Sequence, residues 1–217
     1  GFDGSGNIDE AAITTFCTGT TCTVSSWIDQ SGNGNNMTAA AQSNEPTIYT
    51  GGAIEKERGR VVLRNTGNDS MLFDIDKVER YDVFSIIKAD SNAILLGSET
   101  GADFLFIGQS GSSSASLVNN VTVAAYKKDG VNYTPLTRGA IFSDFSNSNL
   151  IYIDGNFNYD SSRFRNSYFN VGQFPMYSQQ ELLMYVKTGS QVVTSIEENV
   201  GDYFTQNTPL LDTYSGA

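Results

Sequence analysis

The feature that most constrains the fold of this chain is a long series of short apolar segments separated by turn residues. Within these segments apolar and polar residues alternate, which is the period-two pattern of strands with one buried face. Gly-Asn, Asn-Asp and Ser-Gly pairs between the segments favour tight turns. The expected strands are residues 22–28, 46–50, 60–65, 70–75, 81–89, 92–98, 103–109, 114–120, 121–128, 139–145, 149–156, 167–174 and 180–187. So many strands without helices between them predict an antiparallel sandwich of two β-sheets.

Two segments depart from this pattern and predict helices. Residues 7–17 place Asp9 at a capping position before a short apolar run, so one or two helical turns are expected there. Near the end of the sequence, residues 189–204 carry apolar side chains at the helical period. These apolar positions are Val192, Val193, Ile196, Val200 and Phe204. We therefore expect one amphipathic helix that packs across the sandwich.

The length of 217 residues suits one domain of the larger all-β size. Proline is rare and glycine is spread evenly along the chain, so no linker divides it. We expect one sandwich domain over residues 1–204, followed by an extended tail or linker over residues 205–217. The abrupt start at Gly1 indicates a piece of a longer polypeptide or a processed product.

The charge balance excludes several classes of function. The chain has 24 acidic and 13 basic side chains, a formal net charge of −11 and no histidine. Such a surface repels nucleic acid and anionic lipid, and no apolar run is long enough to span a membrane. Without histidine there is no Ser-His-Asp triad, no Cys-His dyad and no histidine-based zinc site. Neutral sugars and divalent cations remain compatible with this charge.

The two cysteines, Cys17 and Cys22, flank a Gly-Thr turn. A short disulfide is one interpretation, and it requires an oxidising compartment. Free thiols are another, whereas a thiolate metal site lacks its other two ligands. Only 17% of the residues are charged, which leaves a surface of Asn, Ser, Thr, Gln and Gly. This composition is typical of an extracellular or virion-exposed β protein.

The run WIDQSGNGNN, residues 27–36, is rich in Gly and Asn. It is not a phosphate loop, because no lysine follows the glycines and no parallel βα unit surrounds it. As a structural turn, it would bury Trp27 while Asp29 hydrogen-bonds the amides of the loop. As a binding loop, it would direct Asp29, Asn33 and Asn35 toward a sugar or a calcium ion. The structural interpretation is favoured, and both stay open.

A second polar run has oxygen-bearing side chains at alternate positions near the N-terminus. These are Asp3, Ser5, Asn7 and Asp9. The spacing is that of the first half of a calcium loop, but Thr14 stands where the bidentate glutamate of such a loop belongs. A polar turn followed by a helix cap is therefore favoured over a calcium site. Calcium is the one possible cofactor that the sequence suggests.

Taken in order, GFDGSGNIDEAAITTFC, VSSWIDQSGNGNNMTAA, EPTIYTGG and RVVLRN resemble the concanavalin A-like, laminin-G-like domains of phage and bacterial surface proteins. YDVFSIIKAD resembles an inner-sheet strand of that family, and NLIYIDGNFN a hairpin with a short Gly-Asn turn. QELLMYV and the IEENVGDYF helix resemble its closing elements. The chain lacks the basic strand that precedes GFD in the family, and Ile28 stands where members often have Tyr. The resemblance implies a jelly-roll β-sandwich with a short N-terminal helical turn and one C-terminal helix.

The resemblance also implies a function. It predicts a non-catalytic module of a virion fibre, spike or tail, exposed at the virion surface or outside the cell, that binds host-cell glycan. Its partners would be that glycan and other virion subunits, with a homo-oligomer as one arrangement. In such sandwiches, loops at one rim pair amides and carboxylates with sugar hydroxyls. The residues expected at that rim are Asp29, Asn33, Asn35, Asn119, Asn156 and Tyr159.

Two alternatives remain open: a purely structural virion domain and a glycoside hydrolase. The run at residues 27–36 also resembles the catalytic domain of α-L-arabinofuranosidases, and hydrolysis would need two carboxylates in a cleft. Asp74, Asp76 and Glu79 have an acid-x-acid-x-x-acid spacing, although pairing with nearby basic residues on the surface is favoured. Glu181 is a lone carboxylate that enters a buried strand, where its neighbours favour a structural hydrogen-bonding role and a perturbed acid is the alternative to test.

Overall fold

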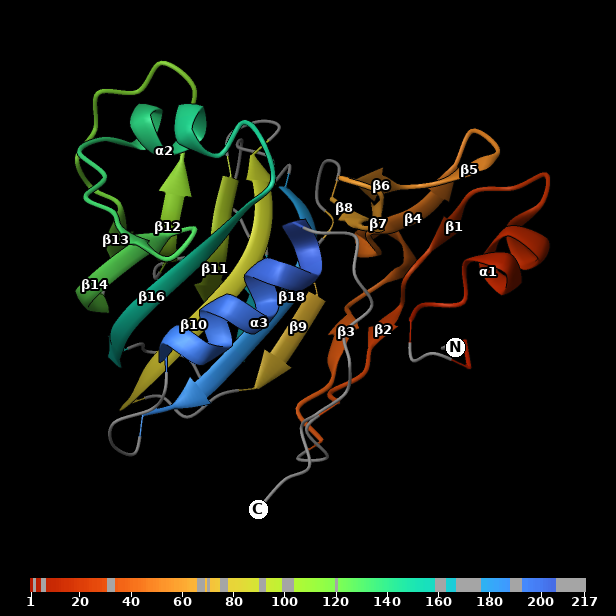
Figure 1. Ribbon diagram of the computed structural model, residues 1–217, viewed down its shortest axis with the longest axis horizontal. Coiled ribbons are helices and arrows are strands. Elements are labelled where there is room, and N and C mark those ends of the chain that lie inside the picture. The colour runs from red at the N-terminus through yellow and green to blue at the C-terminus, as the bar shows by residue number, and fades with distance from the viewer. Residues whose placement is uncertain are drawn as a thin grey trace.

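The computed structural model describes residues 1, 3–4, 7–30, 34–65, 69, 71–74, 78–89, 93–98, 104–119, 121–158, 163–166, 177–187 and 193–205. This part of the chain consists mainly of antiparallel strands in two large sheets, with few helices (Figure 1). The predicted all-β class is confirmed. The strands of each sheet follow one another through antiparallel pairs, as the alternating sequence pattern requires.

The larger sheet has nine strands. Its order is β1 (Cys22–Thr23), β4 (Thr47–Thr50), β8 (Leu63–Arg64), β18 (Tyr177–Val186), β10 (Val78–Ala89), β16 (Asn149–Asn158), β14 (Val121–Lys128) and β15 (Val131–Asn132), and β5 (Ala53–Ile54) pairs with β4. The smaller sheet has seven strands. Its order is β13 (Val118–Asn119), β12 (Phe104–Gly108), β11 (Ala93–Ser98), β17 (Arg163–Asn166), β9 (Met71–Asp74), β3 (Met37–Ala39) and β2 (Ser26–Trp27). A separate hairpin pairs β6 (Lys56–Glu57) with β7 (Arg60–Val61).

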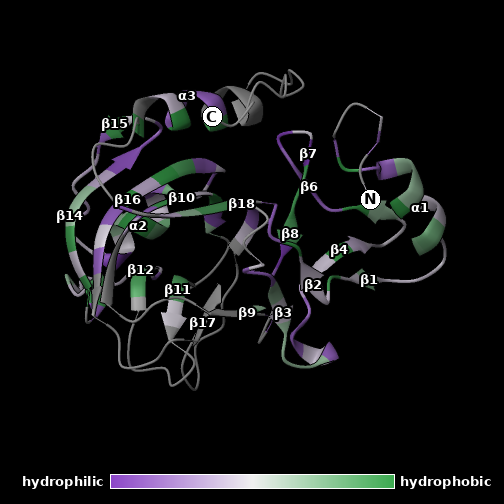
Figure 2. Cartoon of the chain, turned by 90° about the horizontal axis from the view of Figure 1, so that it is seen from below, coloured by the Kyte–Doolittle hydropathy of each residue, from purple (hydrophilic) through white to green (hydrophobic). Residues whose placement is uncertain are grey.

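The main core lies between the two large sheets. From the larger sheet, Val83, Ile87 and Ile153 are fully buried, and Leu105 and Phe106 of the smaller sheet belong to the same cluster. The two sheets therefore pack face to face through the side chains that alternate inward on each strand. Figure 2 shows the larger sheet lying between the smaller sheet and a helix on its other side.

That helix is α3 (Val193–Thr205), and it covers the outer face of the larger sheet (Figure 1). Its Val200 packs with Phe84, Ile86 and Tyr152 in a second apolar cluster, to which Ile196 also contributes. The central strands are thus buried on both faces, which explains why apolar side chains such as Val83 and Phe84 of β10 occur on both of its sides. The amphipathic C-terminal helix predicted from the sequence is confirmed, although the side chain of Phe204 and all of Val192 lie outside the described residues.

The short N-terminal helix is also confirmed, as α1 (Glu10–Cys17). The Asp9 side chain accepts a hydrogen bond from the Ala12 backbone N–H and caps the helix. A disulfide joins Cys17, at the end of α1, to Cys22 in β1, with the two Cα atoms 5.8 Å apart. No helix in the described part of the chain has the length and apolarity that a membrane-spanning helix needs.

One predicted strand, residues 139–145, is wrong, because this segment forms helix α2 (Arg138–Asp144). The side chain of Thr137 caps it by accepting from the Ala140 N–H. Ile141 and Phe145 are four residues apart and both fully buried, so their spacing fits one face of a helix. The apolar content of the segment suggested a strand, but its period is helical.

Other predicted strands begin or end at different residues from the strands in the structure. The strand predicted at residues 149–156 is present, but the hairpin that the resemblance implied for residues 149–158 is not, because β16 runs from Asn149 through Gly155 to Asn158 as one strand. For the strand predicted at residues 114–120, the described residues 114–119 form a strand only at Val118 and Asn119. Residues 167–174 lie outside the described residues, while β17, Arg163–Asn166, is a strand just before them.

Candidate functional site

The loop after β2 is closed by its own side chains. Asp29 Oδ2 accepts a hydrogen bond from the Asn35 backbone N–H at 2.9 Å, and Asn36 Oδ1 accepts from the Asp29 N–H at 2.8 Å. Gly34 has a φ of +80°, a conformation that glycine adopts without strain. Trp27, which precedes the loop, packs partly buried against the main core. Asp29 thus acts within the loop, as the structural interpretation expected, and Asn33 lies outside the described residues.

The N-terminal polar run has the contacts of a turn and a cap. Asp3 Oδ1 accepts from the Asn7 backbone N–H at 2.9 Å, and Asp9 caps α1. Ser5 lies outside the described residues. Across the residues that the structure describes, no group of three or more Asp, Glu, Cys or His side chains could hold a metal ion. Calcium binding by this run stays a prediction.

The residues predicted to form one glycan-binding rim lie in different places. Asp29 follows β2, at one edge of the smaller sheet, while Asn119 is on β13 at the opposite edge. Asn156 is exposed on β16 of the larger sheet. Tyr159 lies outside the described residues. The described candidates are therefore not gathered at a single site, and glycan contact by each of them stays a prediction.

The acid-x-acid-x-x-acid residues Asp74, Asp76 and Glu79 lie where the chain passes from the smaller sheet to the larger one. Asp74 ends β9 in the smaller sheet, and Glu79 lies near the start of β10 in the larger one. Asp76 is outside the described residues. These positions do not lie on one strand, so strand alternation does not place their carboxylates on one face.

The structure brings together a different set of charged side chains, on the outer face of the larger sheet. Asp82 of β10 and Asp154 of β16 lie directly opposite each other. Lys187 Nζ is 2.8 Å from Asp154 Oδ2 and 3.4 Å from Asp82 Oδ1. The Tyr152 hydroxyl donates to Asp82 Oδ1 at 2.7 Å. Asp82 is 0% exposed, so this group of side chains is a buried polar cluster within apolar strands.

Helix α3 adds a third carboxylate to this cluster. Glu197 is buried, and its Oε2 pairs with Lys127 Nζ of β14 at 2.8 Å. The Lys127 ammonium also lies 5.5 Å from the ring centroid of Tyr152, a cation–π distance. The ring of Phe84 is 4.9 Å from that of Tyr152 and 6.3 Å from that of Tyr185. We call Asp82, Phe84, Lys127, Tyr152, Asp154, Tyr185, Lys187 and Glu197 the outer-face cluster.

The protonation of the outer-face cluster follows from its contacts. Burial raises the pKa of Tyr152, and the hydrogen bond to Asp82 and the nearby carboxylates raise it further. The hydrogen bond to Asp154 raises the pKa of Lys187, against the opposing effect of burial. Both groups therefore keep their protons at neutral pH. Three carboxylates face two ammonium groups, which leaves one formal negative charge on the cluster.

Two carboxylate oxygens of the cluster have unused acceptor capacity. Asp82 Oδ2 and Glu197 Oε1 are buried and have no hydrogen-bond partner among the described residues. A buried acceptor without a partner is costly, because the hydration it had in the unfolded chain is not replaced. These oxygens are therefore the atoms of the cluster best able to accept a hydrogen bond from a ligand or a water molecule.

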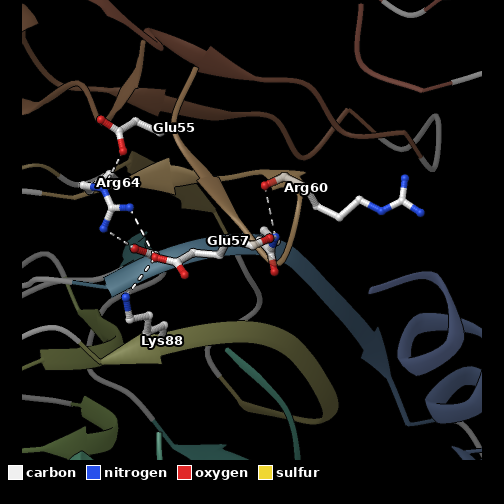
Figure 3. Close-up of polar contacts among 7 residues, drawn as sticks. Glu55, Glu57, Arg60, Arg64 and Lys88 are labelled. Carbon is white, nitrogen blue, oxygen red and sulfur yellow. Dashed lines mark hydrogen bonds and ion pairs between the residues drawn. The ribbon is translucent and has the colours of Figure 1, made fainter. Parts of the chain in front are cut away.

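A second polar cluster holds the β6–β7 hairpin against the same sheet (Figure 3). Arg64 Nε pairs with Glu55 at 2.7 Å, and Arg64 Nη2 pairs with Glu57 at 3.2 Å. Lys88 Nζ of β10 also pairs with Glu57, at 2.9 Å. Gln180 Nε2 donates to the Glu57 carbonyl at 3.0 Å. These opposed charges neutralise one another and fix the hairpin, which is a structural role.

Glu181 lies in β18 opposite Ile86, whose side chain packs on the outer face of the larger sheet. Burial raises the pKa of Glu181 to about 7, although a hydrogen bond from the Leu182 backbone N–H opposes the shift. Glu181 can therefore hold a proton near neutral pH, which is the property required of a general acid. Asp82 and Asp154, in contrast, are paired with a lysine and suit hydrogen-bond acceptance better than proton transfer.

Comparison with known proteins gives one partial match. The family model described as "Alpha-L-arabinofuranosidase B, catalytic" matches residues 2–66, under a third of the chain. The match includes α1, the disulfide and the loop at residues 27–36, but it ends before Asp82, Asp154, Glu181 and Glu197. No curated protein and no solved structure matches the chain.

Sequence reasoning did not identify the outer-face cluster. A local signal for the cluster was present, because Asp82 and Asp154 are acidic residues that stand next to apolar residues inside predicted strands. Charged residues are rarely buried unless they are paired. Which residues pair with them depends on the strand register, and the sequence pattern does not give that register.

Proposed function

We propose that this chain is a non-catalytic carbohydrate-binding domain with a concanavalin A-like jelly-roll fold, displayed on a virion or another extracellular surface. The observation that carries this proposal is the pairing of Asp82 and Asp154 with the single ammonium group of Lys187. A glycosidase needs two carboxylates with different protonation states and access to water. Two carboxylates that both pair with one lysine favour ligand recognition over hydrolysis.

Three further observations support the proposal. The partial match is to the catalytic domain of a family that acts on sugar. The disulfide between Cys17 and Cys22 fits an oxidising, extracellular environment. The exposed amides of Asn35, Asn119 and Asn156 offer the donors and acceptors that pair with sugar hydroxyls. Among them, Asn35 is the first candidate contact, because its loop lies within the matched residues.

The experiment is a glycan array, with and without calcium, on the full chain and on Asn35→Ala. The matched control is Asn147→Ala, which changes an exposed amide in a turn outside the loop. Binding of neutral glycans that weakens in Asn35→Ala and persists in Asn147→Ala supports the proposal. No binding to any glycan would contradict it and favour a purely structural surface domain. Binding that requires calcium would revive the metal interpretation of Asp3 and Asp9.

A second candidate function is glycoside hydrolysis of the arabinofuranosidase type. It is favoured by the family match at residues 2–66 and by the pKa of about 7 at Glu181. Its test is arabinose release from arabinan by the full chain. Activity that disappears in Glu181→Gln, or in a variant with amides at 74, 76 and 79, would replace the binding proposal with this one.

A further inference from the structure

We propose that α3 is a displaceable cover and that the sheet face beneath it is a binding face for a neutral saccharide. The inference rests on the proposed carbohydrate-binding function. It adds where the saccharide binds and which element controls access to that face. The face consists of the outer-face cluster residues that belong to the larger sheet, and α3 lies across their strands (Figure 1). In Figure 2 the same helix forms a separate layer above β10, β16 and β18.

The apolar part of this face is aromatic. The rings of Phe84, Tyr152 and Tyr185 lie on three adjacent strands, with centroids 4.9 Å and 6.3 Å from that of Phe84. Binding sites for small polar ligands combine such aromatic surface with a few fixed polar groups. Here the fixed groups stand beside the rings, since the Tyr152 hydroxyl bonds directly to Asp82.

The polar part of the face selects a neutral, hydroxyl-bearing ligand. The fully buried Asp82 keeps Oδ2 without a partner among the described residues, and a sugar hydroxyl could donate to it. Lys187 is held by two carboxylates and has three donor hydrogens. Because the cluster carries one net negative charge, an anionic sugar would be repelled and a neutral one would not.

The attachment of α3 is of a kind that can be released. Its described polar contact with the sheet is the pair between Glu197 and Lys127, and its described apolar contacts come from Val193, Ile196 and Val200. Glu197 Oε1 of α3 and Asp82 Oδ2 of β10 are buried without hydrogen-bond partners among the described residues. The unpartnered acceptor of Glu197, which lies on α3 itself, weakens the docking of the helix. Asp82 bonds the hydroxyl of Tyr152, whose ring belongs to the same apolar cluster as Val200 of α3, so a ligand that bound Asp82 and covered Tyr152 would compete with the helix.

The experiment uses the full chain and two variants that loosen α3. Glu197→Gln removes the charge that pairs with Lys127, and Val200→Asp places a charge in the apolar contact. Glu198→Gln is the matched control, because it makes the same substitution on the next, exposed residue of the helix. Hydroxyl-radical footprinting follows oxidation of Tyr152, which is 4% exposed when α3 is docked. An array of neutral glycans, with an oligogalacturonate as the anionic probe, measures binding.

We expect several-fold faster oxidation of Tyr152 and several-fold stronger binding of neutral glycan in both loosened variants, with neither change in Glu198→Gln. If Tyr152 is oxidised as slowly in both variants as in the full chain, α3 does not leave the sheet and the inference fails. Faster oxidation without a gain in binding would show that the exposed face takes no saccharide. If the full chain binds glycan, loses it in Asn35→Ala and gains no binding in the loosened variants, the proposed function stands while this inference fails. If no variant binds any neutral glycan, both fail.

Discussion

Asp82 and Asp154 lie directly opposite each other on neighbouring strands, and one lysine bridges their carboxylates. Lys187 holds the two like charges together in a place where Asp82 has no contact with solvent. An unbridged pair of buried carboxylates would repel and would lack the hydration that each has in water. Lys187 therefore stabilises the two carboxylates on the outer face of the larger sheet.

The first prediction concerns this lysine. Lys187→Met should lower the free energy of unfolding by about 2 kcal/mol, less than for a fully buried pair because part of the lysine is exposed. Urea denaturation measures the change. Lys56→Met is the control, since Lys56 pairs with Glu10 in an exposed ion pair. Its loss should cost at most about 0.5 kcal/mol. Equal effects of the two substitutions would contradict the role assigned to Lys187.

Glu181 predicts a specific pH dependence of stability. Its pKa is about 7 in the folded protein, whereas a glutamate in an unfolded chain titrates near 4.5. The folded state therefore binds the proton more tightly, so the stability that Glu181 contributes is complete below pH 4.5. It is lost as the pH rises toward 7, by about 3 kcal/mol in all.

The measurement compares unfolding of the full chain and of Glu181→Gln between pH 4.5 and 8. Glutamine cannot ionise, so the difference in stability between the two proteins should shift in favour of Glu181→Gln as the pH rises. Glu198→Gln, on the exposed face of α3, should run parallel to the unmodified chain. A constant difference between the chain and Glu181→Gln across this range would show that Glu181 is not buried as described.

The disulfide predicts sensitivity to reductant. Cys17 and Cys22 are separated by five positions, so the bond closes a short loop, and chain entropy gives about 2 kcal/mol of stabilisation. Reductant should lower the urea midpoint of the chain accordingly. A variant with serine at both positions should start from the lower midpoint and not respond to reductant. An unchanged midpoint in the reduced chain would mean that the bond adds no stability.

The loop contact of Asp29 predicts a local effect. Asp29→Ala removes the acceptor for the Asn35 N–H and should destabilise the loop by about 1 kcal/mol. Hydrogen exchange of the Asn35 amide should accelerate, while amides in β10 keep their protection. If exchange at Asn35 does not change and glycan binding is lost, Asp29 is a ligand contact rather than a support of the loop.

The periodicity of apolar side chains correctly predicted the helices and strands in which that periodicity is clear. The strand at Val121–Lys128 and the helix at Val193–Thr205 follow from side-chain periodicity alone. Helix α2 was missed because a short apolar run fits either period, and only the cap at Thr137 and the four-residue spacing of Ile141 and Phe145 favour a helix.

The candidate site could be predicted only in part. The turn contacts of Asp29 and the cap at Asp9 involve residues close in sequence, and both followed from their chemistry. The pairing of Asp82 with Asp154 joins residues far apart in sequence, and it depends on the register between β10 and β16. Register is a property of the assembled sheet, and a shift of one residue between the two strands would place the two carboxylates on opposite faces.

The most direct test of the central claim is a calorimetric titration of the full chain with the neutral glycan selected on the array, followed by analysis of the recovered glycan. The account predicts saturable binding and a glycan of unchanged length, because the carboxylates Asp82 and Asp154 are held by Lys187 and bind without transferring a proton. Shortened glycan products, or no measurable binding, would contradict it.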